Sequence, residues 1–333
     1  MTFQLYKTEL KAPQKNMTSL LPASAGQVLT NPENYRASPD LAAAVNVALR
    51  LRQPLLVTGE PGTGKTQLAH SVTWQLGLGQ VLEFETQSNS IARDLFYSYD
   101  HMSRFHAAQT KTGSDDNLDY LEYQALGKAI LLANKNSTVK DFLRPAMDFQ
   151  HPGEPRLSVV LVDEIDKAPR DFPNDILNQI RRMYFRLGPM NNVKVEADPQ
   201  WRPILIFTSN SEKHLPDAFL RRCVYYHIPF PEDNELKDIV ASRLGKTAEA
   251  LKAEPVIYDA LEFFQKVRNM APQLQKKPAT AELLDWLMLL QDMQQEKGTL
   301  SSDDWQISLP CLLKTSTDRE SVMKRMPQWL TSE

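Results

Sequence analysis

Short apolar segments recur along about the first two-thirds of the chain, and stretches with helical periodicity lie between them. The apolar segments run over residues 54–57, 81–84, 158–162, 204–208 and 224–228. Segments of this length that are bounded by Gly, Pro and polar residues are typical of buried strands. Because these strands alternate with helices, the pattern predicts an α/β fold with a parallel, five-stranded sheet flanked by helices.

Helical periodicity is clearest after Ser38, which is placed to cap a helix that has Pro39 at its first position. A second helix is predicted between the first two strands, and others over about residues 119–134 and 171–186. The alternation of apolar and charged residues at 193–196 predicts a hairpin within residues 188–202.

The pattern changes after Pro231, where apolar residues recur only at helical spacing. We therefore predict an α/β domain over residues 37–231 and a smaller, all-helical domain over residues 232–333. Residues 87–152 have little consistent periodicity and are treated as an insert in the first domain. Residues 1–36 are mixed polar and are predicted to form an N-terminal arm with little regular structure.

A glycine-rich segment directly follows the first predicted strand and matches the pattern G-x-x-x-x-G-K-[ST] in full. Its residues are Gly59, Glu60, Pro61, Gly62, Thr63, Gly64, Lys65 and Thr66, and Gln67 follows them. Glycines permit backbone angles that let consecutive N–H groups form an anion-binding nest at a helix N-terminus. Lys65 is expected to reach the β- and γ-phosphates of ATP, and the Thr66 hydroxyl to ligate Mg²⁺. The position between a strand and a helix favours this interpretation over a turn without a ligand.

Two carboxylates end the apolar segment at residues 159–162, since Asp163 and Glu164 follow it directly. The first is expected to hold Mg²⁺ through water, and the second to polarise the water that attacks the γ-phosphate. Acidic residues can also simply end a strand and cap the next helix. The complete phosphate loop upstream favours the catalytic interpretation, and a Glu in this position fits hydrolysis better than transfer to a small-molecule acceptor.

Together the motifs resemble those of the AAA+ ATPases, and within them the MoxR family, over about residues 35–330. Residues 59–66 resemble Walker A, and residues 161–168 resemble Walker B with its usual continuation. Residues 207–210 resemble sensor 1, which implies that Asn210 lies at a strand tip beside the attacking water. Residues 217–223 resemble the arginine-finger region. The family pattern favours Arg222 as the finger, and Arg221 is the alternative.

The resemblance implies a protein that binds ATP and Mg²⁺, hydrolyses ATP in a homo-oligomeric ring, a hexamer, and remodels or activates a partner protein. It also implies partners with von Willebrand A domains. The insert resembles a helix-2 insert, residues 188–202 a pre-sensor-1 hairpin, and residues 232–333 the AAA+ lid. Lids usually present a sensor-2 arginine, which residues 276–282 lack. The favoured interpretation of Lys276 and Lys277 is a solvated lysine pair, and Lys277 as a substitute for the arginine is the alternative.

The overall charge bears on the choice of partner. A net charge of −3 argues against nucleic acid as the main partner, and the insert mixes acidic with basic residues rather than presenting a cationic strip. A nucleic-acid motor or a defence-system switch built on the same core is the alternative function. A small-molecule kinase fits worse, because it leaves Asn210, Arg222 and the helical domain without a role.

Cysteine content and hydropathy bear on the compartment. The two cysteines, Cys223 and Cys311, are too few for a disulfide framework or a zinc site, and we expect free thiols in a reducing cytoplasm. No apolar run approaches the roughly 20 residues that span a bilayer, and the first residues show no signal pattern. We therefore expect a cytoplasmic protein without a membrane segment.

Overall fold

The computed structural model describes residues 31–330, apart from residues 112, 146, 211–214 and 271–272. Most of the predicted N-terminal arm, residues 1–30, therefore lies outside the described residues. The described chain divides into two compact units. The first comprises residues 37–60 and 65–229, and the second comprises residues 31–36, 61–64 and 230–330.

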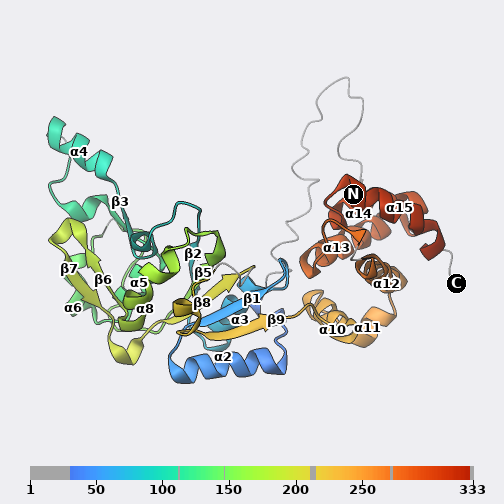
Figure 1. Ribbon diagram of the computed structural model, residues 1–333, viewed down its shortest axis with the longest axis horizontal. Coiled ribbons are helices and arrows are strands. Elements are labelled where there is room, and N and C mark those ends of the chain that lie inside the picture. The colour runs from blue at the N-terminus through green and yellow to red at the C-terminus, as the bar shows by residue number, and fades with distance from the viewer. Residues whose placement is uncertain (1–30, 112, 146, 211–214, 271–272, 331–333) are drawn as a thin grey trace. The chain divides into compact units, whose positions relative to one another are not determined.

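A five-stranded sheet forms the centre of the first unit (Figure 1), and its strands run parallel in the order β2-β5-β8-β1-β9. They are β1 (Leu55–Gly59), β2 (Leu82–Glu85), β5 (Val159–Asp163), β8 (Ile204–Ser209) and β9 (Val224–Ile228). β1 is buried throughout and β5 is buried up to its last residue, as expected of a parallel sheet that is covered on both faces. The predicted α/β fold with five parallel strands is confirmed.

Two helices flank the strand that leads into the glycine-rich segment. α2 (Pro39–Leu51) packs against β9 and β1, and α3 (Lys65–Gln75) packs against β5, β1 and β8. The Ser38 side chain accepts a hydrogen bond from the Leu41 N–H at 3.2 Å, so Ser38 caps α2 as predicted. α3 begins at Lys65, so the glycine-rich segment ends at a helix N-terminus.

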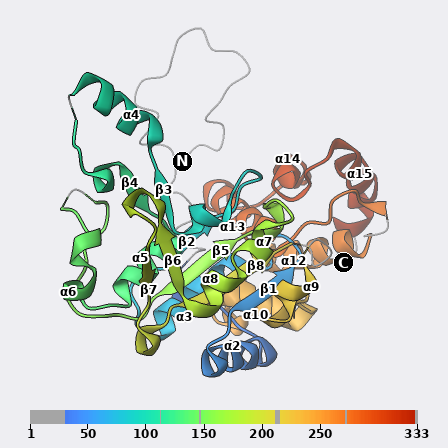
Figure 2. The ribbon, with the colours of Figure 1, turned by 60° about the vertical axis from the view of Figure 1, so that its left-hand side comes forward.

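The insert between β2 and β5 contains more regular structure than its periodicity indicates. β3 (Tyr97–Tyr99) pairs antiparallel with β4 (Leu121–Tyr123), and three helices, α4 (His101–Thr110), α5 (Ala125–Leu132) and α6 (Asn136–Val139), complete it. The predicted helix over residues 119–134 is wrong at its start, because residues 121–123 pair with β3. In both ribbon views α4 extends outward from the sheet (Figures 1 and 2).

The predicted helix over residues 171–186 is also wrong in part. It is divided into α7 (Phe172–Asp175) and α8 (Leu177–Arg182), and Met183 ends α8 in the left-handed conformation at φ 48°. Residues 184–187 form strand β6 (Tyr184–Leu187), which pairs antiparallel with β7 (Val193–Glu196). The hairpin predicted at residues 188–202 therefore begins at Tyr184, inside the stretch predicted as helix. The short helix α9 (Asp217–Leu220) precedes β9.

The C-terminal part of the second unit is helical, as predicted. Its helices are α10 (Asp233–Arg243), α11 (Ala248–Lys252), α12 (Pro255–Asn269), α13 (Thr280–Lys297), α14 (Ser302–Leu312) and α15 (Ser316–Leu330). The rings of Phe263, Trp286 and Trp305 pack together in its core, and the Trp286 indole N–H donates to Ser308 Oγ at 2.7 Å. None of the described helices combines the length and apolar character needed to cross a membrane.

Candidate active site

The glycine-rich segment connects β1 to α3. Gly62 and Gly64 have φ values of 75° and 86°, which L-residues with side chains rarely adopt. The sequence therefore needs glycine at both positions to make the turn from the strand into the helix. Gln67, in the first turn of α3, has a buried side-chain Oε1 that finds no hydrogen-bond partner in the described part of the chain.

Lys65 is the first residue of α3 and is buried, with 7% of its surface exposed. Its ammonium donates to the backbone carbonyls of Gly59 at 3.0 Å and of Glu60 at 2.9 Å. Burial lowers the pKa of this ammonium, while the charges of Asp163, Asp166 and Glu164 oppose the shift. Lys65 is therefore a buried cation held against the glycine-rich loop, with carboxylates near it.

Asp163 lies at the end of β5 and faces Thr66. The Thr66 hydroxyl is 3.1 Å from each carboxylate oxygen of Asp163. The Thr208 hydroxyl also donates to Oδ1 of Asp163 and accepts a hydrogen bond from the Glu164 backbone N–H at 2.8 Å. Thr208 thus joins the ends of β5 and β8, and it fixes both the Asp163 carboxylate and the peptide that follows it.

Glu164 turns away from Asp163 because its backbone is left-handed, with φ 52° and ψ 50°. For a residue other than glycine this conformation costs roughly 1–3 kcal/mol, so the surrounding contacts must hold it in place. Oε1 of Glu164 accepts a hydrogen bond from Nδ2 of Asn210 at 3.1 Å, and the other oxygen forms an ion pair with Lys167. The two adjacent carboxylates therefore have different partners.

The Lys167 hydrogen bond is the largest effect that holds the pKa of the Glu164 carboxyl below its ordinary value. The Asn210 amide and the Lys65 charge act in the same direction, and partial burial opposes them. Asn210 is itself held by its backbone N–H, which donates to Oδ1 of Asp166 at 3.2 Å. Glu164 is thus an ionised, partly exposed carboxylate with a defined orientation.

The structure brings most of the predicted site residues together at one edge of the sheet. Lys65, Thr66, Asp163, Glu164 and Asn210 are connected through the contacts above. Arg222 is not part of this group: the residue is exposed, and its guanidinium donates to the carbonyl of Ala218 in the preceding helix α9 at 2.6 Å. Arg221 and Lys277 are also exposed.

Sequence reasoning gave no separate role to Thr208 or Lys167, although both stand in the quoted motifs. The signal for Thr208 was available in the strand order. β5 and β8 pair in parallel with Val162 beside Phe207, so that the next residues, Asp163 and Thr208, are neighbours. The ion pair of Lys167 depends on the left-handed turn at Glu164, which residue types alone do not indicate.

The chain belongs to the AAA family, the ATPase family associated with various cellular activities, whose model matches residues 55–231. The matched region contains all five strands of the central sheet and the residues of the candidate site from Gly59 to Asn210. No curated protein sequence matches the chain.

Among solved structures, the chain is similar to two variants of RuvB from Thermotoga maritima, a Lys-to-Arg mutant and a Thr-to-Val variant. Each is 14% identical, and each comparison covers 81% of this chain and 66% of the RuvB chain, with TM-scores of 0.45 and 0.42. The chain thus spans slightly less than two-thirds of these relatives, and a likeness at this level says nothing about function.

Proposed function

We propose that this chain binds ATP with Mg²⁺ at residues 59–67 and hydrolyses it. Lys65 exchanges its two carbonyl partners for the β- and γ-phosphates, and the N–H groups of the loop surround the phosphates. Glu164 accepts a proton from the attacking water, and Asn210 orients the Glu164 carboxylate. The lowered pKa of Glu164 keeps its carboxylate ionised at neutral pH, the state that a base requires.

The residues present fit a magnesium ion. Mg²⁺ prefers oxygen ligands and is usually held by one or two protein groups together with phosphate oxygens and water. The Thr66 hydroxyl and the Asp163 carboxylate supply such oxygens at a mutual distance of 3.1 Å. Thr66 and Asp163 would hold a bound Mg²⁺, which would supply positive charge to neutralise the negative charge that develops on the phosphates. Thr208 holds Asp163 in place by its hydrogen bond.

The observation that carries the proposal is the separation of Asp163 and Glu164 into two roles. Asp163 faces Thr66 on the helix that follows the phosphate loop, whereas Glu164 faces Asn210 at the tip of β8. Two acids that only ended a strand would not need a left-handed turn and a bridging Thr208 to direct them apart. A metal-binding carboxylate beside a catalytic base needs this separation.

Phosphate release by the full chain with ATP tests the proposed activity. We expect turnover that requires Mg²⁺ and that falls by about 100-fold or more in Asp163→Asn, since the variant loses a charged ligand. Asp171→Asn, at an exposed position outside the site, is the matched control and should keep full turnover. Turnover without divalent cations, or an Asp163→Asn protein within about tenfold of the wild type, would contradict the assignment.

We further propose that the chain works as a homo-oligomeric ring, a hexamer, in which Arg222 acts as the arginine finger. What supports this is the placement of Arg222, which is exposed and, among the described residues, has no hydrogen bond or ion pair with Lys65, Asp163, Glu164 or Asn210. An arginine that acts on the γ-phosphate of a neighbouring subunit must be free of its own site. Such fingers contribute about 10³–10⁵ to the rate.

Mixing two inactive variants tests the finger. Lys65→Ala lacks its phosphate contact and Arg222→Ala lacks its finger, so neither should hydrolyse ATP well alone. In mixed rings an Arg222→Ala subunit supplies Lys65 while its Lys65→Ala neighbour supplies Arg222. Partial recovery of turnover, over a series of mixing ratios, is expected. Co-assembly without any recovery would contradict a finger that acts between subunits, and Arg221→Ala is the matched control.

We also propose that ATP hydrolysis drives the remodelling or activation of a partner protein, as in the MoxR family. In this assignment residues 37–231 bind the nucleotide, residues 232–333 form the lid, residues 1–36 form an arm, and the insert and hairpin contact the partner. A partner with a von Willebrand A domain is the first to test. Glu164→Gln with ATP should retain such a partner, and Lys65→Ala should not. Equal retention by both variants would contradict coupling to the nucleotide.

A further inference from the structure

A pocket lies in the first unit, at the opposite edge of the sheet from the candidate active site. Pro54, Leu157 and Ile204 line it, and they stand at or just before the starts of β1, β5 and β8. Because these strands are parallel, their starts share one edge and their ends, with Gly59 and Asp163, share the other. Ligands of open α/β sheets usually bind at the carboxyl ends of the strands, so the nucleotide does not account for this pocket.

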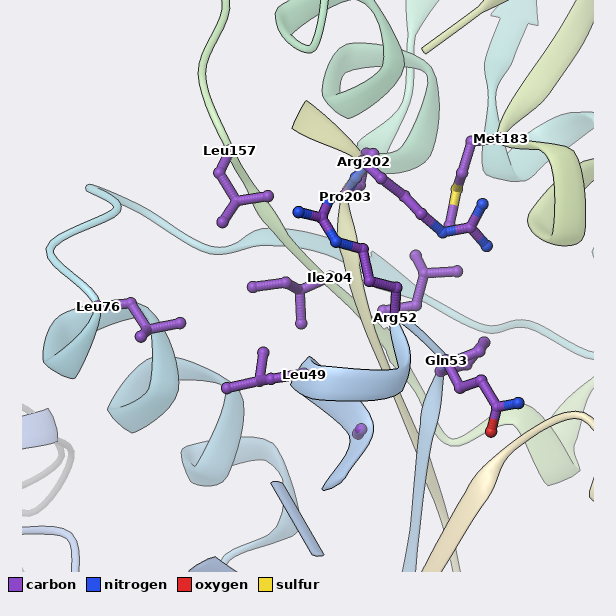
Figure 3. Close-up of a pocket in the computed structure, with 12 residues that line it drawn as sticks. Leu49, Arg52, Gln53, Leu76, Leu157, Met183, Arg202, Pro203 and Ile204 are labelled. Atoms are coloured by element: carbon purple, nitrogen blue, oxygen red, sulfur yellow. The ribbon is translucent and has the colours of Figure 1, made fainter. Parts of the chain in front are cut away.

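The pocket is large enough for a small organic group and has an apolar wall. Its volume is about 230 Å³, larger than an engineered apolar cavity of about 150 Å³ that admits benzene. Figure 3 shows the side chains of Leu49, Leu76, Leu157 and Ile204 along one side of it. Leu76 is 44% exposed, so part of this apolar wall is open to solvent.

Two arginines also line the pocket, and none of its twelve lining residues is acidic. In Figure 3 the Arg52 side chain extends toward Leu157 and the Arg202 side chain extends toward Met183. Neither Arg52 nor Arg202 has an acidic partner among the described residues. Burial lowers the pKa of the Arg202 guanidinium, and the charge of Arg52 lowers it further. An anion between the two would remove this repulsion.

Both guanidinium groups are held in place by the backbone. Arg52 ends α2 in the left-handed conformation at φ 51°, and its Nη1 donates to the carbonyls of Pro199 at 3.1 Å and Gln200 at 3.0 Å. Arg202 donates to the carbonyls of Ile180 and Arg181, both at 2.9 Å. A guanidinium has five N–H donors, so each arginine keeps donors for a ligand.

We propose that this pocket binds a carboxylate with a short apolar body. The apolar body lies against Leu49, Leu157 and Ile204, and the carboxylate accepts hydrogen bonds from Arg52 and Arg202. Arginine forms charged, two-pronged hydrogen bonds with carboxylates, and the apolar wall excludes a bare inorganic anion as the matching ligand. Such a group is supplied either by a free short-chain acid or by the last residue of a polypeptide with an apolar side chain.

Calorimetric titration of the full chain tests the ligand class. Hexanoate represents the free acid, and a short peptide with a C-terminal leucine represents the polypeptide end. At least one should bind, while hexanol, inorganic phosphate and the amidated peptide should bind about tenfold more weakly or worse. The tighter of the two carboxylates identifies the source. Binding of neither, or equal binding of hexanol or phosphate, would overturn the proposal.

Variants locate the site. Arg52→Gln should weaken carboxylate binding about tenfold or more, whereas Arg50→Gln, exposed on the same helix and outside the pocket, should not change it. Arg202→Gln should also weaken carboxylate binding, and Leu157→Trp, which should block the pocket, tests the site if Arg202→Gln does not fold. Lys65→Ala should leave binding unchanged, because that residue belongs to the phosphate loop. Loss of binding in Lys65→Ala, or an equal effect of Arg50→Gln, would place the carboxylate elsewhere.

Discussion

Asn210 and Glu164, which lie 46 positions apart in the chain, are joined by a hydrogen bond of 3.1 Å from Nδ2 to Oε1. The bond exists because β5 and β8 are parallel neighbours and Glu164 turns into the left-handed conformation directly after β5. It fixes a carboxylate that Lys167 contacts on its other oxygen. Asn210 is thus a positioning residue for the proposed base.

Asn210→Ala should lower kcat for ATP by about tenfold to 100-fold and leave nucleotide affinity within about threefold of the wild type. The variant removes a donor that orients Glu164 but no contact to the phosphates. Steady-state kinetics together with a direct nucleotide titration separates the two effects. A rise in KM with an unchanged kcat would mean that Asn210 acts in binding instead.

Asn210→Asp adds a charge-specific test of the same contact. A second carboxylate beside Glu164 raises the pKa of Glu164, because like charges disfavour ionisation. The base works only when ionised, so the acidic limb of the kcat profile should move to higher pH. A profile with the same acidic limb as the wild type would show that the two side chains do not interact during turnover.

Lys65→Ala should abolish detectable nucleotide binding without lowering the thermal stability. In the wild type this ammonium is buried and has a lowered pKa, so its removal relieves a cost of burial while it deletes the phosphate contact. Nucleotide titration and a thermal melt of the same sample measure both quantities. Lys324→Ala, at an exposed position, is the control. Wild-type affinity in Lys65→Ala would exclude the phosphate loop as the binding site.

The tip of the β6–β7 hairpin should serve coupling and not chemistry. Replacing residues 190–193 with Gly and Ser should spare ATP binding and weaken the remodelling of a partner. Among the described contacts, this tip is tied to the insert, since Asn117 Nδ2 donates to the neighbouring Pro189 carbonyl at 2.8 Å. Loss of nucleotide binding in the replaced protein would instead place the hairpin in the nucleotide site.

Asp304 should make the helical unit sensitive to acid. The hydrogen bond from Lys297 is the main cause that lowers the pKa of this carboxyl to about 2, and the N–H and hydroxyl of Ser301 add to it. A carboxyl with a depressed folded-state pKa stabilises the fold above its ordinary value of 3.8, and this stabilisation is lost as pH falls toward about 2. Asp304→Asn should lower the free energy of unfolding by about 1–2 kcal/mol at pH 7.

Chemical unfolding of both proteins across the pH range checks the Asp304 prediction. The difference between wild type and Asp304→Asn should be constant at neutral pH and should shrink below about pH 4. Asp303→Asn, at the preceding exposed position, is the matched control. A difference that persists unchanged to pH 2 would show that the carboxylate charge does not stabilise the fold.

The sequence predicts the central sheet well because each of its strands is a short, continuous apolar run. Ser38 and the glycine-rich segment are also predictable from the sequence, because the local backbone conformation at these positions requires those residue types. The strand at Leu121–Tyr123 was missed because it depends on a partner more than twenty positions away, at Tyr97–Tyr99. The need for glycine at position 127 could not be predicted from the sequence either. A Cβ there would lie 1.9 Å from the Phe96 carbonyl oxygen, and this close approach exists only in the folded chain.

Only part of the candidate site can be predicted from the sequence. Residue types and motif spacing are enough to predict roles for Lys65, Thr66, Asp163 and Glu164. The bridge that Thr208 makes between Asp163 and the Glu164 N–H requires the register of β5 against β8. The carboxylate pocket at the other edge has no sequence motif at all, since its two arginines, Arg52 and Arg202, come from distant segments.

The central claim is that Glu164 activates the attacking water while other residues bind ATP. Glu164→Gln keeps the shape and the contact with Asn210 but cannot accept a proton, and general bases of this kind contribute about 10²–10⁴ to the rate. The deciding measurement is ATP affinity and single-turnover hydrolysis in Glu164→Gln, with Glu85→Gln, exposed at the end of the neighbouring strand β2, as the control. We predict wild-type affinity and hydrolysis slowed at least about 100-fold. Hydrolysis within about tenfold of the wild type would contradict the account.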